Sequence, residues 1–407
     1  MKQYIGIDIA KHEHVAASRY EDGEAHGKAF PFANDEGGFA SLLARFRELG
    51  ADQENCLVVM ESTGHYWMAL WEFLLLHGFD IAVVNPVLTD AFRKADTLRK
   101  TKTDRVDAFL IAEYARFKNL GPTRVSPEDA EGLKQLTRYR HYLVKERTAL
   151  KNRLTSVADR TFPELADLFS NGNDSATARA VLREFGSAEK IARTDVRTLT
   201  KVVRQASHGR FGRAKADEIK AAARASVGTS FAADALAFEA NHIAELVAHL
   251  DKEIAKLEDE IARLLDPEVG ALLQTIPGIG PTCAAVIAAE VGDPDRFEDP
   301  KKLFAYAGME SSKSQSGKFD GDRQHMSKRG PSSLRDALMT AADGARKHDP
   351  YFGDYYDSLV ARGKHHYVAV SGCARKLCGV ILAVLRERRP YEPRPSIQSR
   401  QKQPSED

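Results

Sequence analysis

Hydrophobic and polar positions alternate at the start of the chain, which is the pattern of a β-strand. Between residues 3 and 10 the three isoleucines lie on one face, and Tyr4, Gly6, Asp8 and Ala10 lie on the other. Both faces are largely apolar, so the segment is predicted to be a central strand with Asp8 pointing inward. A buried carboxylate without a partner costs several kcal/mol. We therefore expect a ligand or a partner close to Asp8.

Further strand patterns are found near residues 14–20, 27–33, 57–61 and 80–86, with a turn at 21–23. Residues 66–79 instead repeat tryptophan and leucine at helical spacing, which predicts a helix with one buried face. Pro86 is expected to end the last strand. Three strands followed by strand, helix, strand and helix predict a mixed α/β sheet with flanking helices.

Four acidic side chains follow these elements in a fixed order. Asp8 lies in the first strand, Glu61 closes the strand at 57–61, and Asp104 and Asp107 stand three apart at the start of a predicted helix. The carboxyl end of a parallel strand is where α/β sheets bind ligands, and residues three apart share a helix face. Simpler interpretations exist: Glu61 as a helix cap, and the aspartates as partners of the helix dipole.

Together the four acids have the order and the positions that a metal-dependent nuclease of the ribonuclease-H type needs. Carboxylates gathered in one place repel each other unless divalent cations neutralise them. Two such ions about 4 Å apart can stabilise both the attacking and the leaving oxygen of a phosphodiester. We therefore predict that Asp8, Glu61, Asp104 and Asp107 bind Mg²⁺ or Mn²⁺ and act on nucleic acid.

The middle of the chain carries two long helical patterns. Apolar residues recur at near-heptad spacing between Leu133 and Val157 and again between Ile243 and Leu264. This spacing predicts a coiled coil, either an antiparallel pair within the chain or a contact between copies in a dimer or tetramer. Arg140 and Arg147 occupy seam positions, which indicates an anionic partner. The segment at about 161–235 is predicted to be an inserted helical segment.

The C-terminal third combines a glycine-rich hairpin with clustered cations. Pro277-Gly278-Ile279-Gly280 leads into an alanine-rich helix, as in a helix-hairpin-helix motif, where Gly278 and Gly280 let backbone N–H groups approach a phosphate. A plain helix–helix turn is the alternative. A polar loop follows. It contains Ser316 next to a glycine, a combination that by itself is typical of an ordinary turn.

Composition limits the possible functions and locations of the protein. The 407 residues carry a net charge of only +1, but basic residues outnumber acidic ones locally, by eight to two between Lys134 and Arg160. Such stretches are expected where phosphate backbones bind. The four cysteines lack metal-site spacing and are expected to be reduced. We find no secretory signal and no apolar run near the ~20 residues of a membrane span, and expect a cytoplasmic protein.

The patterns divide the chain into four parts. We expect an α/β domain at 1–125, coiled-coil helices with the insertion at 126–265, a mostly helical domain at 266–388 and a disordered tail at 389–407.

With these residues identified, the chain resembles the DEDD-type transposases of the Piv/MooV DNA-invertase family, the recombinases of small bacterial insertion sequences. The resemblance covers nearly the whole length, and it is specific because eight motifs occur in the family's order. They are Tyr4-Ile5-Gly6-Ile7-Asp8-Ile9-Ala10-Lys11, Met60-Glu61-Ser62-Thr63-Gly64, Val84-Asn85-Pro86, Lys102-Thr103-Asp104-Arg105-Val106-Asp107-Ala108, Ile276-Pro277-Gly278-Ile279-Gly280, Phe304-Ala305-Tyr306-Ala307-Gly308, Gln315-Ser316-Gly317 and Met326-Ser327-Lys328-Arg329-Gly330.

The resemblance implies a RuvC-like N-terminal domain whose four catalytic acids match the four described above. It also implies a C-terminal transposase domain whose nucleophilic serine matches Ser316. Lys328, Arg329 and Arg335 would then lie near the transferring phosphate. Similar proteins work as oligomers on donor and target DNA, to which a non-coding RNA encoded by the element pairs. The 161–235 segment is a departure from the family pattern.

Two other functions remain open from the residues alone. A RuvC-like, structure-specific endonuclease in which water attacks would use the same four acids. An actin-like ATPase or sugar kinase also begins with a strand such as Gly6-Ile7-Asp8, but the Asp-x-Gly-Gly phosphate loop expected in mid-chain is not found in the sequence. A nucleic-acid-binding scaffold without catalysis would leave the four ordered acids unexplained.

Overall fold

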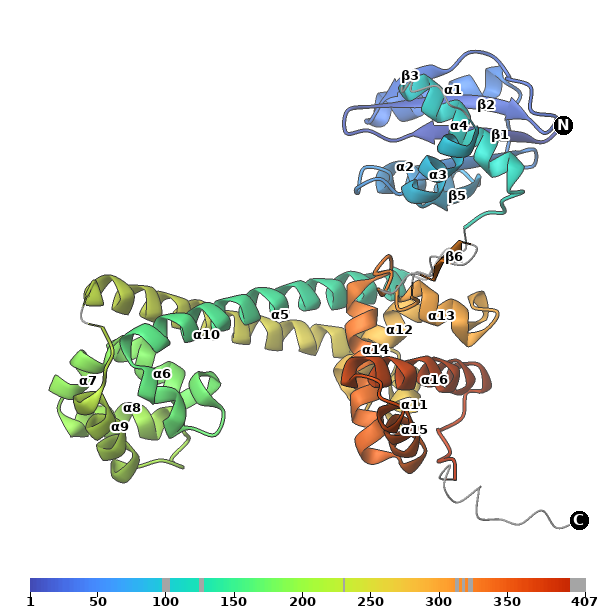
Figure 1. Ribbon diagram of the computed structural model, residues 1–407. Helices are drawn as coiled ribbons and strands as arrows, with labels where there is room; N and C mark the ends of the chain where they lie inside the picture. Colours follow the sequence, from blue (N-terminus) through green and yellow to red (C-terminus); the bar gives the residue numbers. More distant parts are fainter. Residues whose placement is uncertain are drawn as a thin grey trace, which may run out of the picture. The chain divides into compact units, whose positions relative to one another are not determined.

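The computed structural model describes residues 1–96, 103–123, 128–229, 231–311, 315–316, 319–320 and 325–395. The chain divides into two compact units, Met1–Val125 and Ser126–Asp407 (Figure 1), which are described separately below.

The first unit is built on a five-stranded mixed sheet. Its strands are β1 (Gln3–Asp8), β2 (Glu13–Tyr20), β3 (Phe30–Ala33), β4 (Cys56–Glu61) and β5 (Asp80–Val84), in the order β3-β2-β1-β4-β5. β1 pairs antiparallel with β2 and parallel with β4, and β5 continues the sheet in parallel. The predicted mixed α/β sheet, with the first strand at its centre, is confirmed.

Helices cover both faces of this sheet. α1 (Glu36–Glu48) and α2 (Met68–Leu76) pack on the face that carries Ile5, Ile7 and Met60. α4 (Asp104–Phe117) packs on the opposite face, against Tyr4 and Val59, and α3 (Pro86–Asp96) lies beside it. The sequence patterns above did not predict α1 or α3.

The second unit contains a long helical hairpin formed by α5 (Glu128–Thr161) and α10 (Ala233–Leu264). Arg140 lies 2.5 Å from Glu258, and Arg147 lies 2.8 Å from Asp251. Because the numbers rise along one helix and fall along the other, the pair is antiparallel. The two predicted alternatives are thus resolved in favour of packing within the chain, and the anionic partners of the seam arginines are acids of α10.

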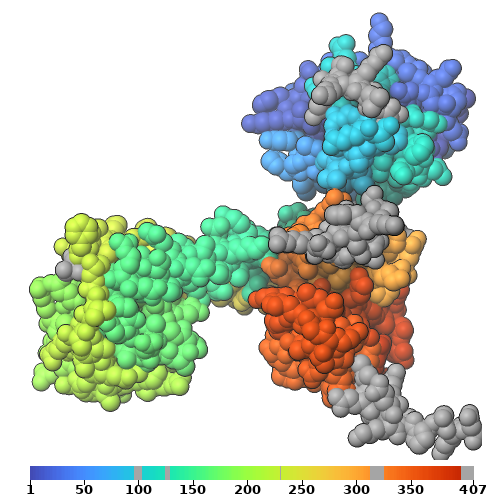
Figure 2. Space-filling view, viewed as in Figure 1, coloured from blue at the N-terminus to red at the C-terminus, as the bar shows by residue number. Residues whose placement is uncertain are grey.

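Short helices are inserted between α5 and α10 and enclose a core at one end of the hairpin. This core joins both long helices, and in Figure 2 the inserted segment is the green to yellow-green mass beside one end of them. The inserted elements are η1 (Pro163–Leu168), η2 (Gly172–Asp174), α6 (Ala176–Phe185), α7 (Ala188–Arg193), α8 (Val196–Ala206) and α9 (Arg213–Ala225).

A second helical core follows α10 and packs on the other end of α5 through α12. It is formed by α11 (Pro267–Gln274), α12 (Pro281–Val291), η3 (Pro294–Arg296), α13 (Pro300–Tyr306), α14 (Ser332–His348), α15 (Pro350–Ala361) and α16 (His366–Glu387), with the two-residue strands β6 (Gln315–Ser316) and β7 (Phe319–Asp320) between α13 and α14. The predicted helical remainder of the chain is confirmed.

Two expectations for the C-terminal end need correction. α16 has the length and the apolar composition of a membrane span, which the sequence analysis did not find, but much of its apolar surface is buried in the helical core. Tyr391, in the predicted disordered tail, donates a hydrogen bond of 2.8 Å from its hydroxyl to Asp349 and one from its backbone N–H to Thr275. Residues 389–395 therefore belong to the folded unit, and 396–407 lie outside the described residues.

Candidate functional site

Asp8 and Glu61 end two neighbouring parallel strands. The register pairs Ile7 of β1 with Met60 of β4, so Asp8 and Glu61, the next residues, end their strands side by side. Adjacent strands lie about 4.8 Å apart, and alternate residues share a face. Asp8 therefore lies on the face of Tyr4, and Glu61 on the face of Val59, which is the face covered by α4.

The backbone of α4 crosses directly over Gly6, two residues before Asp8. A Cβ atom at residue 6 would lie 2.2 Å from the carbonyl oxygen of Ala108 and 2.4 Å from the amide nitrogen of Ala112. Only glycine permits this approach, and it places the first turn of α4 over the carboxyl end of β1. That turn carries Asp104 and Asp107.

The hydroxyl of Thr103 caps α4 by accepting a hydrogen bond of 3.4 Å from the backbone N–H of Val106. The aspartates are therefore not needed for the cap, although the positive end of the helix dipole favours their charge. α2 begins at Met68 after Trp67, so Glu61 does not cap that helix. The simpler interpretation of Glu61 is thus wrong.

All four predicted acids line one open pocket of ≈ 420 Å³ within the first unit. The residues around it are Asp8, Ile9, Ala10, Glu61, Thr63, Pro86, Thr89, Asp90, Arg93, Asp104, Asp107 and Leu110. They come from the ends of β1 and β4, from α3 and from the first turns of α4. Segments about one hundred residues apart in sequence thus supply carboxylates to the same cavity.

Glu61 and Asp107 have protein partners inside this pocket. Glu61 accepts hydrogen bonds from the hydroxyls of Thr89 and, at 3.2 Å, Thr63. Asp107 Oδ1 lies 3.3 Å from Arg93 Nη1, and Nη2 of the same guanidinium binds Asp90. Sequence reasoning missed these α3 residues. Pro86 at a first helical position and the spacing of Asp90 with Arg93 were the available signals.

The residue types suit Mg²⁺ or Mn²⁺, since carboxylate oxygens are the donors that these ions prefer. The side-chain arrangement is less complete. Among the described residues, no three His, Cys, Asp or Glu side chains come together closely enough to hold a metal ion. The acids share a cavity, but Asp107 is turned to Arg93 and Glu61 to its threonines.

Ser316 lies in β6, where it pairs with Phe319 of β7, and its side chain is outside the described part of the chain. The base of the loop that carries it is closely packed. A Cβ at Gly308 would lie 2.6 Å from the amide nitrogen of Gly330, and a Cβ at Gly330 would lie 1.8 Å from the carbonyl oxygen of Tyr306. Arg335 joins the same base by donating to the carbonyl oxygens of Ala307, at 3.0 Å, and Gly330.

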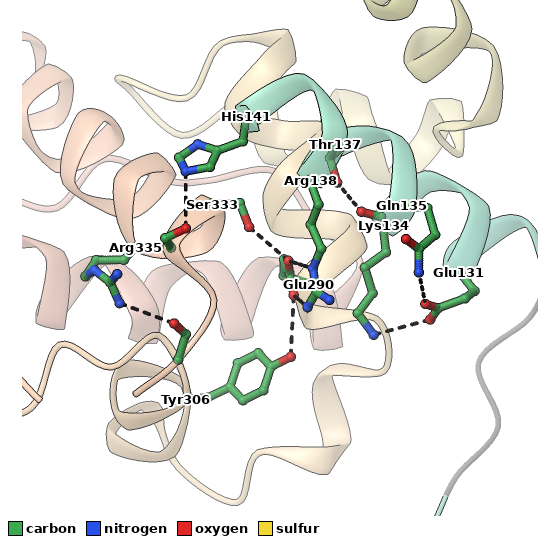
Figure 3. Close-up of polar contacts among 12 residues, drawn as sticks. Glu131, Lys134, Gln135, Thr137, Arg138, His141, Glu290, Tyr306, Ser333 and Arg335 are labelled. Carbon is green, nitrogen blue, oxygen red and sulfur yellow. Dashed lines mark hydrogen bonds and ion pairs between the residues drawn. The ribbon is translucent and has the colours of Figure 1, made fainter. Parts of the chain in front are cut away.

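A buried carboxylate ties both ends of this loop to α5 and α12 (Figure 3). Glu290 of α12 receives two hydrogen bonds from Arg138 of α5, at 2.7 and 2.9 Å. Tyr306, before the loop, donates to it at 3.4 Å, and Ser333, after the loop, donates at 3.0 Å. The Glu290 side chain is 0% exposed, and its hydrogen bond holds the pKa of Arg138 above the usual range.

The remaining predicted nucleic-acid-binding residues differ in their surroundings. Gly278 has φ +89°, and a Cβ there would lie 2.4 Å from the carbonyl oxygen of Ala341, so this glycine is required for packing on α14. Gly280 begins α12 without neighbours in the described structure that a Cβ would meet. Lys328 and Arg329 are exposed, whereas Arg335 holds the loop base.

Comparison with known proteins gives matches along most of the chain. Residues 5–163 match a family model described as a transposase, and residues 270–357 match one described as the transposase family of IS116, IS110 and IS902. A 44.8 kDa protein of insertion element IS116 from Streptomyces clavuligerus is 27% identical over 97% of both chains. The pilin gene-inverting protein of Moraxella bovis is 26% identical over 97% of this chain and 98% of its own length.

Proposed function

The chain is a transposase of the IS110/IS116 family, and on this premise we propose that it recombines DNA by phosphoryl transfer at the pocket of the first unit. The observation that carries the proposal is the gathering of Asp8, Glu61, Asp104 and Asp107 around one cavity from three separate elements. Such a cavity suits a RuvC-like site for a phosphodiester. Transposase activity leaves no role for the ATPase alternative.

The four carboxylates would hold Mg²⁺ or Mn²⁺, and an ion bound there would stabilise the charge on the attacking and leaving oxygens of the phosphodiester. Thr63 and Thr89 hold Glu61 at the wall of the cavity through their hydroxyls. Gly6 keeps the first turn of α4 at the strand ends, so that Asp104 and Asp107 face the same cavity as Asp8.

Ser316 is proposed as the nucleophile. Its Oγ would form a bond to phosphorus while the bond from phosphorus to a deoxyribose oxygen breaks, leaving a phosphoserine link and a free DNA hydroxyl. The serine proton passes to a base or to solvent, and the leaving deoxyribose oxygen takes up a proton from solvent. The glycine contacts at the loop base and the Glu290 hydrogen bonds pack both ends of the serine loop against the helical core.

The proposed partners are donor and target DNA and a non-coding RNA encoded by the element. The RNA rests on the family resemblance alone. Assembly as a dimer or tetramer no longer rests on the heptads, because α5 and α10 pack against each other within the chain. It is supported instead by large apolar side chains that are exposed near the start of α10, namely Val227, Phe231 and Phe238.

Carboxamide variants test the proposal. Asp8→Asn and Glu61→Gln should abolish cleavage of a plasmid that carries the gene with its native flanking DNA, while circular dichroism stays unchanged. Glu113→Gln is the matched control, because Glu113 lies on α4 and pairs with Arg116 outside the pocket. Normal cleavage by Asp8→Asn would show that the pocket is not the catalytic site.

A further inference from the structure

Arg93 brings a positive charge into the pocket of the four acids. It lies on α3, is 23% exposed and faces Asp107, which is 13% exposed. Its guanidinium contacts two carboxylates at once, with Nη1 3.3 Å from Asp107 Oδ1 and Nη2 bonded to Asp90 Oδ1. Arginine keeps its charge at every physiological pH. This charge therefore leaves Asp107 only if the side chain moves.

The neighbouring residue provides a contrast. Lys94 binds the other oxygen of Asp90 at 2.7 Å, but its side chain is 75% exposed. Lys94 and Arg93 together hold the pKa of Asp90 below its usual range. Asp90 is thus a charged anchor for both cations, and of the two only Arg93 lines the described pocket.

A guanidinium on Asp107 competes with any cation for the same oxygen. A divalent ion that takes Asp107 as a ligand must break the contact with Arg93, since both need the carboxylate lone pairs. When that contact breaks, the second bond to Asp90 keeps Arg93 at the rim of the pocket.

We propose that Arg93 is an internal counter-ion of the catalytic pocket, which holds Asp107 in the resting protein and releases it when a divalent cation binds. The proposal rests on the proposed function, because the cation is the one that the four carboxylates would hold. Arg93 is a positioning residue in this scheme. It acts through Asp107 and remains anchored to Asp90.

The proposal predicts an unusual gain of function in metal binding. Removing one positive charge roughly 6 Å from a divalent ion strengthens its binding by about ten-fold, even with the full screening of water. Arg93→Gln should therefore bind Mn²⁺ about ten-fold more tightly than the wild type. Arg93→Lys retains the charge and should stay closer to the wild type than Arg93→Gln does.

Titration of the full-length protein with Mn²⁺, following the electron paramagnetic resonance signal of the unbound ion, measures this affinity without any catalytic step. Lys94→Gln is the matched control. It removes a cation from the same Asp90 but keeps the contact between Arg93 and Asp107, and should tighten Mn²⁺ binding clearly less than Arg93→Gln does, because the Lys94 charge is exposed to solvent. Thermal unfolding of each variant checks that the fold is retained.

Asp8→Asn, in the same titration, separates this inference from the proposed function. Lost Mn²⁺ binding in Asp8→Asn together with tighter binding in Arg93→Gln supports both. Lost binding in Asp8→Asn with wild-type affinity in Arg93→Gln overturns the counter-ion role and leaves the metal site standing. Equal tightening in Arg93→Gln and Lys94→Gln also overturns it, because general surface charge would then explain the effect. Unchanged binding in Asp8→Asn overturns the metal site and the inference together.

Discussion

Replacing Gly6 with alanine should both destabilise the first unit and disable its pocket. The new Cβ would lie 2.2 Å from the carbonyl oxygen of Ala108, whereas ordinary contacts begin near 3.4 Å, so α4 must retreat by about 1 Å. Overpacking of this kind costs about 1–3 kcal/mol. Because Asp104 and Asp107 move with α4, a shift of about 1 Å should also lower the cleavage rate about 100-fold.

Urea unfolding measures the first effect, and single-turnover cleavage of plasmid DNA measures the second. Gly121→Ala is the control, since a Cβ at Gly121 would meet nothing within 4 Å of it in the described structure. It should leave both quantities nearly unchanged. If the free energy of unfolding of Gly6→Ala lies within about 0.5 kcal/mol of the wild-type value and the variant cleaves DNA at the normal rate, the contact between α4 and β1 does not position the acids.

Three further outcomes are expected. Glu290→Ala should cost about 3 kcal/mol in urea unfolding, because it removes a fully buried carboxylate that accepts hydrogen bonds from Arg138, Tyr306 and Ser333. Arg140→Gln should cost less than about 1 kcal/mol, because the carboxylate of its partner Glu258 is 43% exposed; equal costs would contradict this ranking. Burial lowers the pKa of His14, so the unfolded chain takes up a proton that the folded chain does not. The free energy of unfolding should then decrease as the pH falls below about 6.5, by up to about 1.4 kcal/mol per pH unit. In His14→Gln the decrease should be less steep. Denaturant midpoints measured at about pH 7.5 and about pH 5.5 test this. Burial raises the pKa of all four cysteine thiols, to about 12 for Cys56 and Cys378, so a thiol reagent should react quickly only after unfolding.

The sheet could be predicted from sequence because its signals are local. Alternation around Asp8 indicated a strand with two apolar faces, and this strand is the centre of the sheet. α1 was missed because Gly37 and Gly38 weaken its first turn. Gly38 is required there by packing, since a Cβ would lie 1.9 Å from the carbonyl oxygen of Ala33. Pro86 was interpreted as the end of a strand, but it also begins α3.

The candidate site was only partly accessible from sequence. The four acids could be chosen because each ends or begins a regular element, and the pocket brings them together. Pro86 and the spacing of Asp90 with Arg93 could have indicated the helix α3, but the contacts of Arg93 and Thr89 with the acids depend on how α3 packs beside α4. Similarly, the heptads predicted that α5 packs against another helix, but they did not identify that helix as α10 of the same chain. The ion pair between Arg140 and Glu258 joins residues too far apart for any local pattern to indicate.

The role of Ser316 separates recombination through a covalent intermediate from simple hydrolysis. A suicide DNA substrate, incubated with the protein and resolved on a denaturing gel, should show a shifted protein–DNA adduct with the wild type. Ser316→Ala should form no adduct and cleave no DNA, while it still binds DNA and Mn²⁺. Cleavage by Ser316→Ala at the wild-type rate would contradict the serine mechanism, because water would then be the nucleophile at the four carboxylates.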